Sequence, residues 1–205
     1  MRDIQTLYEK IKTAGPASLA MSMGDVHAKG LFSLVFHGQL AGQLTRAYLA
    51  EKKVSPFDAQ LHSHSYDLKI TVLRGRVTHH TATMLETSAQ GAIEMPTYKY
   101  KSALNGGDGV LRYVDERSIL IDEYVIPPAA TLYLKHSDVH TVSCSKGAIW
   151  VVEELGFRAN ETTVLGSPFC VDDLYRKPKQ FEINNAYQKL RRTAQALIDD
   201  HALAA

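Results

Sequence analysis

Short runs of apolar and polar residues suited to β-strands occupy most of the chain between residues 30 and 166. These runs are rich in Val, Ile, Thr and Tyr, which favour the pleated surface of a sheet. They cover residues 30–38, 44–54, 68–84, 97–104, 110–126, 130–134, 140–144 and 148–155. Clusters of Gly, Pro, Asn, Asp and Ser separate the runs, as is typical of turns. This spacing predicts an all-β antiparallel sandwich or barrel with its core in residues 30–166.

The two ends of the chain have helical rather than strand periodicity. Residues 2–14 carry apolar side chains at helical spacing before a Gly-Pro stop signal, so we expect a short N-terminal helix within residues 1–16. Near the other end, the apolar positions at helical spacing are Tyr187, Leu190, Ala194 and Leu197. They predict a C-terminal helix over residues 181–200, packed against the barrel or against a second subunit.

Length and charge narrow the class of protein. A chain of 205 residues that is 45% hydrophobic suffices for one domain with a sizeable core, so we expect residues 1–205 to form a single domain. The net charge of +1 at pH 7 favours neither nucleic acid nor a membrane, which leaves a small molecule as the expected partner. Without a secretory signal or a membrane-spanning window, we expect a soluble, cytoplasmic protein. Cys144 and Cys170 lack CxxC spacing, so we expect free thiols.

Histidine is the residue type with the most informative spacing, and the chain contains nine. His62 and His64 stand two residues apart in a strand-like run, where side chains at i and i+2 share a face and can reach one ion. If that strand is unbroken, Tyr66 shares their face while Asp67 points to the other. A half-exposed strand with solvent-facing histidines would have the same pattern. His140 opens a later strand after a turn, and its side chain could converge on the same point.

With Gly75 closing the run that begins at His62 and His64, and His140 opening the later strand, the chain resembles the cupin superfamily over roughly residues 40–155. The resemblance implies a cupin-type jelly-roll barrel in which these three histidines meet at the mouth around a divalent metal ion. Fe(II) is the implied ion, with Ni, Mn, Zn and Cu as alternatives that suit imidazole ligands. Analogy with the fold also implies a homodimer.

The glutamate of the first cupin motif has no counterpart, because Leu68 and Lys69 occupy its place. Two ligand sets are therefore open. Three histidines alone would be similar to thiol dioxygenases of the cysteine dioxygenase type. Alternatively, Asp67 completes a two-histidine, one-carboxylate site, with or without His140. A group of uncharacterised bacterial and phage cupin-like proteins resembles this chain in carrying HxH, a small residue, an aromatic and Asp, which implies a functional role for Asp67.

Other residues are secondary candidates. Tyr66 is predicted to face inward, where it could hydrogen-bond a bound substrate. One of His79 and His80 should also face inward, as a partner of a ligand, an extra ligand or an ordinary barrel residue. His136 competes with His140 for the place of third ligand. The pattern predicts a buried apolar role for Cys144, and no partner for His27, His37 and His201.

The resemblance implies a mononuclear non-haem iron enzyme, similar to dioxygenases, that acts on a small organic substrate. Two alternatives stay open. One is a cupin that binds a metal or small ligand without turnover, and the other is a metal-independent sugar epimerase or isomerase of the same fold, with histidine as general base.

Overall fold

The structure of the protein, a computed structural model, describes residues 6, 9–10, 13–56, 58–103, 106–166 and 182–203, with the side chains from residue 200 onward left out. Most of the helix predicted within residues 1–16 therefore lies outside the described residues, as do Cys170 and the side chain of His201. A short helix, α2 (Pro16–Leu19), follows directly after the predicted one.

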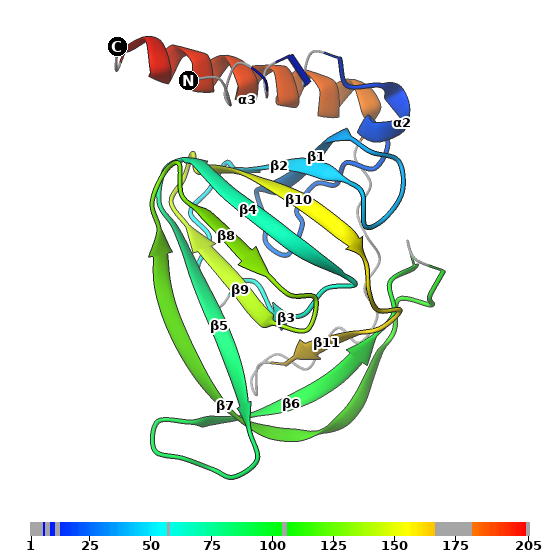
Figure 1. Cartoon of the computed structure of the whole chain (residues 1–205), viewed down its shortest axis with the longest axis vertical. Helices are drawn as coiled ribbons and strands as arrows, with labels where there is room; N and C mark the ends of the chain where they lie inside the picture. Colours follow the sequence, from blue (N-terminus) through cyan, green and yellow to red (C-terminus); the bar gives the residue numbers. More distant parts are fainter. Residues whose placement is uncertain are drawn as a thin grey trace.

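Two layers of antiparallel strands make up the body of the molecule (Figure 1). The first layer is a five-stranded sheet in the order β1 (Leu31–His37), β2 (Thr45–Ala50), β10 (Ile149–Phe157), β4 (Tyr66–Arg74) and β8 (Thr131–Leu134). The remaining strands close into a barrel in the order β11 (Thr162–Leu165), β3 (Leu61–His62), β9 (Val139–Cys144), β5 (Val77–Leu85), β7 (Leu111–Ile126) and β6 (Ile93–Tyr100). The prediction of an all-β jelly-roll barrel is confirmed.

The main hydrophobic core lies between the two layers. Val72 of β4 and Trp150 of β10 pack there with Val77 of β5 and Cys144 of β9. Each large apolar side chain buried in this way contributes about 1.5–3 kcal/mol relative to an exposed one. Cys144 is a buried free thiol whose pKa burial raises to about 11, which confirms its predicted apolar role.

A second core joins the outer face of the five-stranded sheet to the long helix α3 (Ile183–Leu203), which crosses one end of the molecule (Figure 1). Leu34 of β1 and Val151 of β10 pack against Ala186, Leu190 and Ala194 of α3. The four-residue spacing of these helical positions places them on one face, as the sequence pattern predicts. The helix therefore covers the five-stranded sheet of its own chain. No helix in the described part of the chain combines the length and the apolar character needed to cross a membrane.

The strand that would carry both His62 and His64 is interrupted, because β3 ends at His62 and β4 begins only at Tyr66. The intervening residues cross from one layer to the other. Ser63 N donates to Thr163 O at 2.8 Å, and Ser65 O accepts from Arg158 N at 2.7 Å. These bonds hold the crossing segment in place, so the position of His64 depends on tertiary contacts and not on strand periodicity.

Gly75 closes the β4–β5 hairpin, in agreement with its place in the motif. Its φ is +76°, in the left-handed region that side chains rarely adopt. A Cβ at this position would lie 2.9 Å from Ala148 Cα, so the close approach of the β9–β10 turn also requires glycine here.

Candidate metal centre

Three imidazoles from two distant parts of the chain meet between the layers. His62 of β3 pairs directly with His140 of β9, and His64 follows in the crossing segment. The ligand nitrogens of the three residues all lie within 4.8 Å of one another. His64 Nε2 is 2.8 Å from His140 Nε2. The structure thus brings together the three histidines that the sequence pattern singled out.

The spacing of the His64 and His140 nitrogens fits a divalent ion. Because metal–imidazole bonds are about 2.0–2.1 Å long, two nitrogens at right angles around one ion are about 3 Å apart. The 2.8 Å between His64 Nε2 and His140 Nε2 is close to that value. The ring centroid of His62 lies 4.8 Å from that of His64 and 5.6 Å from that of His140, so the three rings are close neighbours. The described residues therefore contain a three-histidine cluster that can hold a metal ion.

The protonation state of the cluster also suits a metal. Burial, followed by the neighbouring imidazoles, lowers the pKa of His64 and of His140 well below the usual histidine value. Neutral imidazole is the form that binds metal ions. His62 Nδ1 lies 2.8 Å from Gln60 O, and donation to this carbonyl leaves Nε2 with its lone pair. At neutral pH His64 and His140 therefore need not lose a proton before they bind a metal ion.

A fourth histidine, His79 of β5, packs against the ring of His140. Its ring is fully buried and parallel to that of His140, with an interplanar angle of 2°. The two Nδ1 atoms are 3.3 Å apart. Donation from His140 Nδ1 to His79 Nδ1 would leave the lone pair of His140 Nε2 for an ion. Burial lowers the pKa of His79 to about 4, so its ring stays neutral and can accept this bond.

The pairing of β5 with β9 decides which member of the His79–His80 pair faces the cluster. His79 pairs with Val142, on the same face of β9 as His140. His80 lies on the opposite face, where its Nε2 is 2.8 Å from Ser143 Oγ. His80 is therefore outside the cluster.

Replacing His79 by phenylalanine is expected to weaken metal binding by about 10–100-fold, because it keeps a ring against His140 but removes the nitrogen that orients it. The measurement is a competitive Co(II) titration of the metal-free protein. Tyr124→Phe is the matched control, since Tyr124 stacks on His79 at 5.9 Å and this variant keeps the ring. Equal affinities in the two variants would show that the Nδ1 contact does not orient the ligand.

His27, for which the sequence pattern predicted no partner, lies against His62. Its ring stacks on that of His62 with 4.4 Å between centroids, and its backbone has a φ of +64°. The residue is exposed, so it lies on the solvent side of the cluster. An isolated histidine in an N-terminal loop carries no spacing signal, and only the fold brings it to His62.

A buried ion pair near His64 could not be predicted from the sequence pattern either. The Arg46 guanidinium of β2 binds the Glu154 carboxylate of β10, and Glu154 Oε2 also accepts a bond from Gly42 N at 2.6 Å. Both charged residues are almost fully buried. Arg46 lies close enough to His64 to contribute to the lowering of its pKa. In the sequence, Arg46 looks like an ordinary polar position of a strand.

Tyr66 lies beside this pair and beside the cluster. Its ring centroid is 5.9 Å from that of His64, and the two rings are stacked. Burial raises the pKa of the Tyr66 hydroxyl above its ordinary value, and a hydrogen bond with Glu154 raises it further, so the group remains a neutral phenol.

The Asp67 carboxylate points away from the three histidines. Asp67 Oδ1 accepts from His136 N at 2.8 Å, and Oδ2 accepts from Arg158 Nε at 2.9 Å. The backbone bond from His136, and then the bond from Arg158, lower the pKa of Asp67. His136 O in turn accepts from His64 N at 2.9 Å. Asp67 and His136 therefore tie the turn before β9 to the segment that carries His64, and neither belongs to the cluster.

Known proteins give no family assignment for this chain. No protein-family model matches the sequence, and no curated protein matches it. The hydroxypropylphosphonic acid epoxidase from S. wedmorenis is 11% identical with a TM-score of 0.39, over 64% of this chain and 53% of that one. Hydroquinone 1,2-dioxygenase PnpCD, in complex with Cd2+ and 4-hydroxybenzonitrile, is 12% identical with a TM-score of 0.33, over 83% and 79%. The chain spans about half the length of the epoxidase. Similarity at this level assigns no family, so the three imidazoles define the candidate centre on their own.

Proposed function

We propose that this protein is a metal-dependent enzyme in which His62, His64 and His140 hold a divalent ion, with Fe(II) as the best candidate. The observation that carries the proposal is the approach of their ligand nitrogens to within 4.8 Å of one another. A bound Fe(II) ion supplies Lewis acidity and redox chemistry toward oxygen, with coordination positions left over for a substrate. The proposed reaction is the oxidation of a small organic substrate by O2.

The surrounding side chains have distinct parts in this proposal. Tyr66, as a neutral phenol stacked on His64, hydrogen-bonds the bound substrate through its hydroxyl oxygen. Asp67 acts as a positioning residue, since its carboxylate binds the turn that leads to His140 and not the cluster itself. Apolar side chains of the core, such as Leu68 and Val72, exclude water from the inner side of the site.

The net charge of +1 supports a small-molecule substrate over nucleic acid or a membrane surface. The homodimer implied by the resemblance remains a prediction.

Oxygen consumption by the iron-loaded protein tests the proposal. A thiol, a diketone and an aromatic diol are offered in turn, and one class is expected to raise O2 uptake above the rate without substrate. Tyr66→Phe is expected to lower that rate about 10–100-fold with unchanged iron content, because only the hydroxyl is lost.

Two other outcomes would contradict the proposal. Tight iron binding without uptake for any class would indicate a binding protein without turnover. A protein that retains no metal ion at all would leave the metal-independent isomerase as the better hypothesis.

A further inference from the structure

Ser143, His80 and Glu123 form a hydrogen-bonded series on the face of the barrel strands that is opposite to the histidine cluster. β5 lies between β7 and β9, and it contributes His79 to one face and His80 to the other (Figure 1). His80 pairs directly with Glu123 of β7. On β9 it pairs with Thr141, so Ser143 is its diagonal neighbour. Long side chains at direct and diagonal positions of a sheet can contact one another.

The distances within this series suit a serine nucleophile, a histidine base and a carboxylate that orients the base. His80 Nε2 is 2.8 Å from Ser143 Oγ, and His80 Nδ1 is 3.1 Å from Glu123 Oε1. Both values lie within the range of about 2.6–3.2 Å that such an arrangement requires. A carboxylate only accepts hydrogen bonds, so in the neutral ring Nδ1 carries the proton and donates it to Glu123. His80 Nε2 then has a lone pair that accepts from the Ser143 hydroxyl.

The imidazole of the series is buried, whereas its two partners are not. The His80 side chain is 4% exposed and that of Glu123 is 64% exposed. Ser143 is half-buried, so it is not sealed in the core. Thr78 of β5 pairs with Ser143 on one side and on the other with Val125, which is 47% exposed. An apolar side chain therefore lies open to solvent on the same face as the serine.

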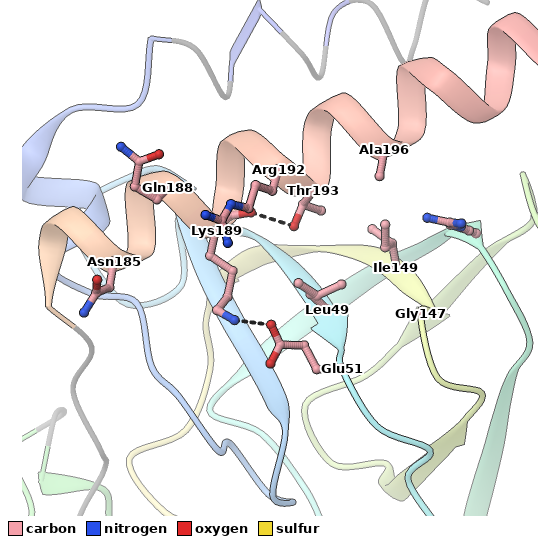
Figure 2. Close-up of a pocket in the computed structure, with 11 residues that line it drawn as sticks. Leu49, Glu51, Gly147, Ile149, Asn185, Gln188, Lys189, Arg192, Thr193 and Ala196 are labelled. Carbon is pink, nitrogen blue, oxygen red and sulfur yellow. Dashed lines mark hydrogen bonds and ion pairs between the residues drawn. The ribbon is translucent and has the colours of Figure 1, made fainter.

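The series is separate from the other two candidate sites of the molecule. The histidine cluster lies on the other face of β5 and β9. The groove between α3 and the five-stranded sheet is lined by residues such as Leu49 and Lys189 (Figure 2). In the described part of the chain, the lining of this groove does not include Ser143, His80 or Glu123. Chemistry at the series therefore requires neither the metal ion nor the groove.

We propose that Ser143 and His80, with Glu123 as a positioning residue, form a second catalytic site that hydrolyses small uncharged carboxylic esters. Ser143 Oγ attacks the carbonyl carbon while its proton moves to His80 Nε2, and this proton then passes to the alcohol that leaves. A water molecule, deprotonated by His80, next attacks the acyl-serine and releases the acid. The proton taken from the water returns to Ser143 Oγ, so one ester and one water give one acid and one alcohol. Val125 contacts the apolar part of the ester, and the negative charge of Glu123 disfavours anionic substrates.

Labelling with a fluorophosphonate tests the proposal, because this probe reacts preferentially with activated serines. The bond from Ser143 Oγ to phosphorus forms, the P–F bond breaks, and fluoride leaves. The full chain, kept metal-free with EDTA, is expected to gain one adduct that peptide mass spectrometry locates at Ser143. Ser143→Ala should abolish this adduct, and His80→Gln should slow its formation at least about tenfold because the base is lost. Near-UV circular dichroism checks that both variants are folded.

Hydrolysis of 4-nitrophenyl butyrate by the metal-free protein measures turnover. Ser143→Ala is expected to lower the rate at least about tenfold. Glu123→Gln is expected to lower kcat with an unchanged KM, because Glu123 acts through His80 and does not touch the ester. Glu116→Gln changes an exposed glutamate of the same strand and is the matched control, which should leave both constants unchanged.

Three outcomes would each overturn the proposal: no adduct at Ser143, unchanged hydrolysis in Ser143→Ala, or equal effects of Glu123→Gln and Glu116→Gln. Any of them would mean that the hydrogen bonds of the series only stabilise the sheet. These measurements exclude metal ions, so their outcome is independent of the oxygen-consumption assay, which concerns the histidine cluster.

Discussion

Replacing His64 by alanine is expected to weaken metal binding by more than about a hundredfold. This loss exceeds the loss of about 10–100-fold expected for a residue that only orients a ligand. His64 contributes the Nε2 atom that lies 2.8 Å from His140 Nε2, and without it two imidazoles remain. Elemental analysis of protein purified without an affinity tag measures occupancy, and titration of the metal-free protein with Co(II) measures affinity. Near-UV circular dichroism checks that the variant is folded.

Two matched variants show whether the effect belongs to the cluster. His37→Ala removes an exposed histidine at the end of β1 and is expected to change nothing. Asp67→Ala is expected to leave the affinity within about tenfold, because its carboxylate acts on the turn before β9. A loss in Asp67→Ala equal to that in His64→Ala would instead place the carboxylate in the ligand set.

Replacing Glu154 by glutamine is expected to lower the free energy of unfolding by about 3–5 kcal/mol. Glutamine keeps the shape of the side chain but leaves the buried charge of Arg46 without its partner. An uncompensated buried charge costs far more than the loss of a surface pair. Urea denaturation of the wild type and the variant, followed by fluorescence of the buried Trp150, measures the difference.

The adjacent residue supplies the control for this experiment. Glu153 pairs with Lys69 at 2.7 Å, but both side chains are about one-third exposed. Glu153→Gln is therefore expected to cost less than about 1 kcal/mol. Similar costs for the two variants would mean that the Arg46–Glu154 pair is no more important than a surface pair. The double variant Arg46→Met, Glu154→Leu should recover much of the loss, because it removes both charges together.

Local patterns were sufficient to predict most of the strands and the long helix. Short runs of β-branched and aromatic residues between turn residues predict most of the strands, and the helical spacing of Leu190, Ala194 and Leu197 predicts α3 to within a few residues. Both patterns are informative because the repeat of the backbone conformation decides which side chains lie together on the buried face of a strand or helix. The same logic singled out His62 and His64, although the shared strand that the prediction assumed is interrupted between them.

The crossing segment between β3 and β4 is a part of the structure that the local pattern did not predict. Ser63 and Ser65 look like outward-facing polar positions of a continuous strand, yet both are buried and bonded to neighbouring strands or loops. Their partners, Thr163 and Arg158, lie about a hundred residues later, so no local pattern could have shown the break.

By itself, the sequence determined the fold class and the identity of three histidines that the structure brings together, because periodicity and motif spacing are properties of neighbouring residues. Only the tertiary structure decided that His79 and not His80 faces His140, that His27 covers His62, and that Asp67 binds a turn. Each of these outcomes depends on how strands pair or on how loops meet across the two layers. Such contacts join residues far apart in the chain, and they are set by packing that no short stretch of sequence contains.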